Sequence, residues 1–70
     1  MLVKEIDFSK YSYSRICVIR SEGPAYFPSK AEAYVIKLYG NETVADENGI
    51  EPDSDKDWLN IRLADVKKGS

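Results

Sequence analysis

The segment from Tyr13 to Arg20 constrains the fold of this chain more than any other. It has β-branched residues at its centre and ends at the turn-forming run Ser21-Glu22-Gly23-Pro24, which predicts a strand that leads into a hairpin. Alternate residues of its apolar run Ile16-Cys17-Val18-Ile19 point to opposite faces of a sheet. Both faces of this strand are therefore apolar, in a chain of only 70 residues.

One helix is predicted after the hairpin. The short return strand Ala25-Tyr26-Phe27 is followed by a capping box, in which Ser29 precedes Glu32 by three residues. Gly40 supplies the left-handed conformation that commonly ends a helix, so we expect a helix from about Lys30 to Tyr39. Its expected apolar face consists of Ala31, Tyr34, Val35 and Leu38, with Tyr39 at its edge and Ile36 outside it.

The remaining segments complete an α+β domain that spans residues 1–70. The alternation from Trp58 to Asp65 predicts another strand, and the acidic segment 42–57 before it predicts a loop. Residues 1–12 fit either an extra N-terminal edge strand or an extended arm. The strand-strand-helix-strand order predicts a small antiparallel sheet with one helix packed on one face.

One helix covers only one face of such a sheet, so something else must cover the other. The candidates are a second copy of the chain, a partner protein, or the N-terminal segment with its aromatic residues Phe8, Tyr11 and Tyr13. A domain of this size buries only about 60% of the surface of its unfolded chain. We therefore expect a homodimer.

The composition excludes several classes of function. The chain has no histidine, which excludes Ser-His-Asp, Cys-His and His-metal sites, and we expect neither an enzyme nor a cofactor. Asp53 to Asp57 opens like a calcium loop, but Trp58 and Ala64 stand where that loop needs Gly and Glu, so we expect no metal. The single cysteine, Cys17, and the absence of an apolar leader or spanning segment predict a cytoplasmic protein.

The charge is segregated along the chain. The acidic segment 42–57 carries a net charge of -6, and the rest of the chain carries +4. Spaced carboxylates present negative charge as a phosphate backbone does and steer toward a basic, nucleic-acid-binding surface of a partner, although such a run also serves simply to solvate a loop. The residues expected to bind a partner are Tyr34, Val35, Ile36 and Tyr39 on the helix and Glu42, Asp46, Glu47, Glu51, Asp53 and Asp55 in the acidic segment.

The helix end Leu38-Tyr39-Gly40-Asn41, followed by the strand Leu59 to Val66, resembles the small dimeric phage inhibitors of uracil-DNA glycosylase. In that family a helix ends in Leu-Tyr-Gly-Asn, and the last strand has the pattern aliphatic-x-aliphatic-Arg-Leu-x-x-Val. The resemblance implies a dimer and a pocket of helix aromatics for an apolar side chain of the enzyme. Tyr39 matches one of these aromatics, and Val35 stands where the family usually has Phe.

We therefore expect a non-catalytic, phage-type inhibitor that binds a host nucleic-acid enzyme at its DNA-binding surface, with uracil-DNA glycosylase as the named target. An anti-CRISPR protein that blocks a CRISPR effector would fit the same features. A structural subunit whose open face pairs with itself is another alternative. The last is a nucleic-acid-binding module that uses Trp58, Arg62, Arg15 and Tyr13 on the open sheet face, although a pI near 5.0 disfavours direct binding to nucleic acid.

Overall fold

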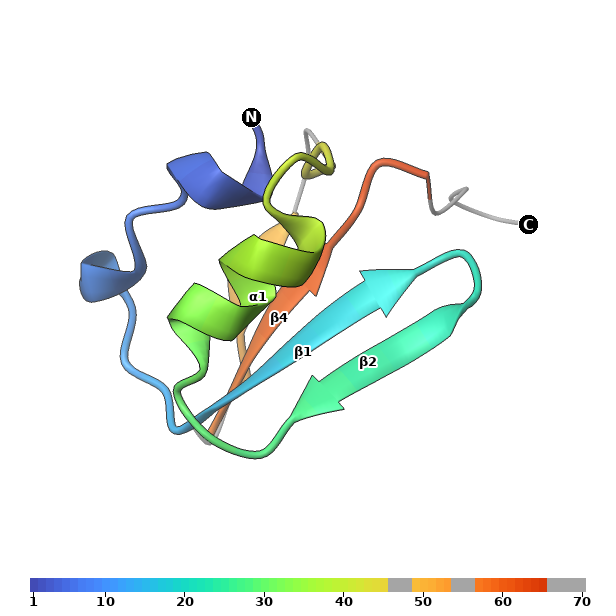
Figure 1. Cartoon of the computed structure of the whole chain (residues 1–70). Helices are drawn as coiled ribbons and strands as arrows, with labels where there is room; N and C mark the ends of the chain where they lie inside the picture. Colours follow the sequence, from blue (N-terminus) through green and yellow to red (C-terminus); the bar gives the residue numbers. More distant parts are fainter. Residues whose placement is uncertain (46–48, 54–56, 66–70) are drawn as a thin grey trace.

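A four-stranded sheet with one helix across it forms the centre of the protein (Figure 1). The computed structural model describes residues 1–45, 49–53 and 57–65. Its elements, in chain order, are the 3-10 helices η1 (Val3–Glu5) and η2 (Phe8–Lys10), strands β1 (Arg15–Arg20) and β2 (Gly23–Phe27), helix α1 (Glu32–Tyr39), and strands β3 (Ile50–Pro52) and β4 (Trp58–Arg62). This confirms the predicted α+β class.

The sheet has the strand order β2-β1-β4-β3 and is mixed. The β1–β2 hairpin and the β3–β4 pair are antiparallel, whereas the central strands β1 and β4 are parallel. The predicted purely antiparallel sheet is therefore wrong at its centre. β2 ends where β1 starts, α1 then leads the chain to the opposite end of the sheet, and β3 brings it back. β4 therefore runs in the same direction as β1, as crossovers between parallel strands allow.

The hydrophobic core lies entirely between the sheet and one layer that covers it. Ile16 and Val18 of β1 lie beside Leu59 and Ile61 of β4, and none of the four side chains is exposed. Val35 of α1 packs onto them. The other buried apolar residues of this cluster are Val3, Ile6, Phe8, Tyr13, Val44 and Leu63.

The N-terminal segment is neither an edge strand nor a cover for the second face. It lies beside α1, on the same side of the sheet (Figure 1). Backbone hydrogen bonds from Val3 N to Glu42 O (3.0 Å) and from Lys4 N to Gly40 O (3.1 Å) hold η1 against the end of the helix. The apolar residues of this segment thus extend the core and leave the opposite face of the sheet uncovered by the described residues.

The ends of α1 differ from the sequence prediction. The N-cap is Ala31 and has no side-chain capping bond, so the expected capping box does not form. Ser29 instead accepts a bond from Ala31 N at its backbone oxygen (2.8 Å). Gly40 is right-handed, with φ −56° and ψ −32°, and not left-handed as expected. A glycine is needed there for space, because a Cβ would collide with the backbone carbonyl of Ile36.

The helix is also rotated relative to the predicted apolar face. Ile36 and Tyr39 are half-buried against the core, whereas Tyr34 is 54% exposed and Leu38 is 49% exposed. Apolar residues occupy most positions of α1, so two overlapping faces of the helix both show the apolar spacing of a buried helix face. Only packing against the sheet decides between them, and it selects the stripe that contains Ile36.

The acidic segment is not simply a loop. Its residues Ile50–Pro52 form β3, which pairs with β4 so that Ile50 lies opposite Ile61. Ile50 packs against the core and supplies the apolar contact that attaches this segment to the sheet edge. This strand could not be predicted from the sequence pattern, because it is short and its neighbours in the chain are acidic.

The rotation of α1 gives the first prediction. We expect Val35→Ala to lower the free energy of unfolding by about 2 kcal/mol, because it removes two buried methyl groups and leaves a cavity. Leu38→Ala, at the half-exposed position, should cost less than about 1 kcal/mol. Urea unfolding followed by circular dichroism measures both values. A larger cost at Leu38 than at Val35 would show that the helix packs with the stripe expected from the sequence.

Candidate functional site

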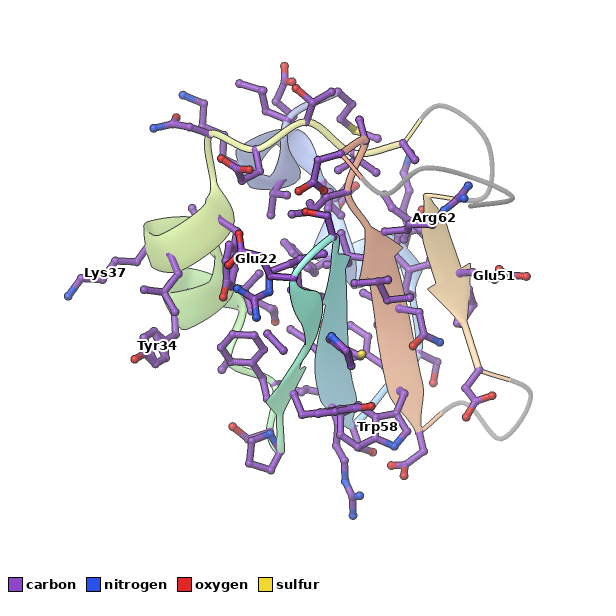
Figure 2. The ribbon with its side chains drawn as sticks, turned by 90° about the vertical axis from the view of Figure 1, so that its right-hand side faces the viewer. Glu22, Tyr34, Lys37, Glu51, Trp58 and Arg62 are labelled. Atoms are coloured by element: carbon purple, nitrogen blue, oxygen red, sulfur yellow. The ribbon has the colours of Figure 1, made fainter. Side chains whose placement is uncertain are left out.

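The face of the sheet opposite α1 is uncovered by any described segment and is the candidate site. We call it the open face. Strand alternation brings to it side chains from all four strands: Cys17, Ile19, Pro24, Glu51, Trp58, Asn60, Tyr26, Arg15 and Arg62. Figure 2 shows Trp58, Glu51 and Arg62 on this side of the sheet, whereas Tyr34 and Lys37 project from α1 on the other.

A hollow of about 460 Å³ lies on the open face between Tyr26 and Trp58. The two ring centroids are 5.5 Å apart and the ring planes meet at 75°, so the rings form an open angle and not a flat surface. Cys17, which pairs with Tyr26 across the strands, is only 5% exposed. The complete lining is Cys17, Ile19, Pro24, Tyr26, Asp53, Trp58 and Asn60. We call this feature the Tyr26–Trp58 hollow.

Arg15 lies over the indole ring of Trp58. Its guanidinium carbon is 5.4 Å from the ring centroid, and a guanidinium nitrogen is 3.7 Å from the Asp57 carboxylate. Backbone N–H groups of Ser14 and Arg15 both donate to the carbonyl oxygen of Asp57, each at 2.8 Å. These hydrogen bonds attach Asp57, the residue before β4, to the start of β1. Trp58 therefore contacts both the Arg15 cation and the ring of Tyr26.

Proline residues lie along both edges of the sheet. On β2, Arg20 and Gly23 close the hairpin, so the backbone groups of Pro24 and Tyr26 point away from the sheet. On β3, Asp53 and Gly49 bond to β4, so the backbone of Pro52 points outward. A proline has no N–H to offer an added strand. Pro28 follows β2 directly, and these are all three prolines of the chain. Binding is therefore favoured on the open face over the sheet edges.

The helix residues that the sequence predicts to bind a partner differ in their exposure to solvent. Val35 is fully buried, so its expected partner contact is wrong. Ile36 is half-buried in the core, and the Tyr39 ring lies 6.3 Å from Phe27 and 5.7 Å from the guanidinium of Arg20. Tyr34 is largely exposed, with its ring 5.9 Å from that of Phe27.

The nominated acidic residues do not form one cluster in the part of the chain that the structure describes. Asp46, Glu47 and Asp55 lie outside the described residues. Glu51 is exposed on the open face, and Asp53 lines the Tyr26–Trp58 hollow. Glu42 instead lines a separate depression with Leu63 and Asp65. Two of the nominated carboxylates therefore share the face that carries the exposed aromatics.

Tyr13, named for a nucleic-acid platform, is not on the open face. It is 5% exposed in the core, 6.4 Å from the Phe8 ring. Burial, followed by a side-chain hydrogen bond to Glu32 and the negative charge of that residue, raises the pKa of the Tyr13 hydroxyl well above its usual range. The tyrosine that lies beside Trp58 on the open face is Tyr26. The register of the hairpin identifies Tyr26, because it puts this residue opposite Cys17.

The chemistry of the open face suits binding. Burial raises the pKa of the Cys17 thiol, which keeps it protonated at neutral pH and a poor nucleophile. Among the described residues, no group of three His, Cys, Asp or Glu side chains is placed to hold a metal ion. None of the helices in the described ranges has the length and apolarity to cross a membrane.

No protein-family model, no curated protein and no solved structure matches this chain.

Labelling of Cys17 tests the hollow. Cys17 is the only cysteine, so a thiol reagent reports on this position alone. We expect slow labelling of the native protein and labelling several-fold faster in Tyr26→Ala, because the Tyr26 ring helps to cover the thiol. Tyr34→Ala removes an exposed tyrosine from α1 and should leave the rate unchanged. An unchanged rate in Tyr26→Ala would mean that the ring does not shield Cys17.

Tyr13 gives a prediction about alkaline pH. Because its pKa is higher in the folded than in the unfolded chain, the unfolded chain loses this proton first as the pH rises. The stabilisation is complete below about pH 10, the usual tyrosine pKa, and is lost above it. Urea unfolding between pH 8 and pH 12 should show a steeper decline for the native sequence than for Tyr13→Phe. Parallel declines would contradict the shifted pKa.

Proposed function

We propose that this protein is a non-catalytic inhibitor that binds a host nucleic-acid enzyme through its open face. The observation that carries the proposal is the Tyr26–Trp58 hollow, with Arg15 beside it and no described segment covering it. Tyrosine, tryptophan and arginine are the residues most enriched among the energetic centres of protein interfaces. A binding role accounts for this composition.

The carboxylates at the β3 edge of the open face support a basic partner. Glu51 and Asp53 lie beside the apolar hollow, at the edge formed by β3 and the residue after it. An apolar anchor next to carboxylates is complementary to a DNA-binding surface, which combines basic side chains with apolar groups. The carboxylates would speed the encounter with such a surface, and the aromatic pair would supply the affinity.

The target that we propose to test first is uracil-DNA glycosylase, because of the resemblance at Leu38-Tyr39-Gly40-Asn41 and Leu59 to Val66. An inhibitor of this kind would act in the cytoplasm of the host cell. A CRISPR effector is the next target of the same type. The homodimer that the resemblance implies is part of the proposal, and a dimer joined by its open faces would compete with the target for the same surface.

A nucleic-acid-binding role is the second candidate, because Trp58, Arg15 and Arg62 share the open face. Two observations favour a protein partner over it. The rings of Tyr26 and Trp58 meet at 75°, so bases could not stack side by side on both. Glu51 and Asp53 on the same face would also repel phosphates.

Titration of uracil excision tests the inhibitor proposal. We expect activity to fall to zero near one protein per enzyme, with a complex that co-elutes in size-exclusion chromatography. Tyr26→Ala should weaken inhibition about tenfold or more if this ring is an energetic centre. Glu51→Gln should slow association, more so at low salt. Tyr34→Ala is the matched control and should inhibit normally.

Two outcomes contradict the proposal. Full enzyme activity at a large excess of the protein, with no complex, would eliminate uracil-DNA glycosylase as the target. Inhibition that is weakened by Tyr34→Ala and not by Tyr26→Ala would move the binding surface from the open face to α1. Chromatography of the protein alone, across a range of concentrations, measures the dimer.

A further inference from the structure

We infer that the Tyr26–Trp58 hollow binds an extended, proline-containing segment of its protein partner, flanked by a basic side chain. This inference rests on the proposed protein-binding function and specifies the chemistry of the segment that the open face recognises. It depends on the angle between the two rings, the hydrogen-bond donors around the hollow, the proline-protected sheet edges and the position of the carboxylates.

The ring geometry fits a compact, rigid apolar group. Two rings 5.5 Å apart at 75° form a corner that offers the face of one ring and the edge of the other. A pyrrolidine ring can contact both sides of such a corner, and proline-rich segments bind aromatic-lined grooves in this manner. A flat base would need one broad stacking surface. One side of the Trp58 ring is already covered by the guanidinium of Arg15 at 5.4 Å.

The hydrogen-bonding groups also fit a proline-containing backbone. A polyproline-type segment exposes carbonyl acceptors and has few N–H donors. The indole of Trp58 and the hydroxyl of Tyr26 each carry a hydrogen-bond donor, and both residues line the hollow. The Asn60 amide, by contrast, already donates to the carbonyl oxygen of Glu51 at 3.2 Å. Trp58 and Tyr26 are therefore the residues suited to bond such a backbone while they contact its rings.

The edges of the sheet disfavour the other common way to bind an extended segment. Pro24 and Pro52 each remove one outward N–H group, from β2 and β3 respectively, so a strand added at either edge would find fewer donors. A segment that binds in extended form would therefore lie across the face. A proline-containing ligand also has no N–H at its prolines, which disfavours β-ladder pairing from its side as well.

The charges select the residue that flanks the proline. Glu51 is exposed in register with Asn60, and Asp53 lines the hollow next to Trp58. A lysine or arginine beside the bound proline would approach the exposed carboxylate of Glu51. A second copy of this chain fits less well, because two of its prolines, Pro24 and Pro52, lie within paired strands and are not part of a free extended segment.

Fluorescence of Trp58, the only tryptophan, tests the inference directly. The probe is a blocked synthetic peptide of alternating arginine and proline pairs, titrated into the full chain. We expect a saturable change in emission and an affinity reduced about tenfold or more in Tyr26→Ala. Tyr34→Ala should bind as the native sequence does. A peptide with alanine in place of every proline should bind several-fold more weakly, and one with glutamate in place of arginine should bind more weakly still.

The alternative occupants give distinct results. No saturable change with the proline peptide would overturn the inference, as would equal binding of the alanine peptide. Binding of oligothymidylate that depends on Tyr26, without peptide binding, would overturn it in favour of nucleic acid. If the peptide fails but glycosylase inhibition is lost in Tyr26→Ala, the proposed function holds and only the segment chemistry is wrong. Peptide binding without glycosylase inhibition would support the inference and eliminate that target.

Discussion

The parallel pairing of β1 with β4 is the interaction on which the rest of this structure depends. It sets Ile16 beside Leu59 and Val18 beside Ile61, and these four side chains are completely buried. The other residues of the hydrophobic core pack together with this row. The pairing also aligns the opposite side of the two strands, where Arg15 lies beside Trp58 and Cys17 beside Asn60. One register thus fixes both the core and the open face.

The distribution of apolar residues explains why one face remains uncovered. The N-terminal segment, α1 and Val44 all pack on the side of Ile16 and Val18. A chain of 70 residues has little apolar material left for a second layer. The aromatic pair Tyr26 and Trp58 is the only ring contact between described residues on the other side, and the two rings line a hollow with Cys17 without closing the face. The open face is thus a consequence of concentrating the core on one side.

Local patterns in the sequence were sufficient for part of this fold. The alternation of Ile16-Cys17-Val18-Ile19 and of Trp58 to Asp65 identified both central strands and the face of each residue, and the apolar Cys17 and Ile19 indicated an uncovered side. The parallel direction was not predictable, because it depends on how the long connection returns across the sheet. The rotation of α1 was hidden because Tyr34 and Leu38 fit the helical period as well as Ile36 and Tyr39 do.

The candidate site was less predictable, for a related reason. A binding surface here is a set of residues from four strands, and only the register brings Tyr26 and Trp58 together from positions far apart in the chain. The sequence shows the three prolines, but their effect on strand addition depends on which backbone groups point away from the sheet. Once Pro24 and Pro52 are placed on opposite edges, strand addition is disfavoured at both. The face is then the surface best suited to recognition, and its composition and charge define what it can bind.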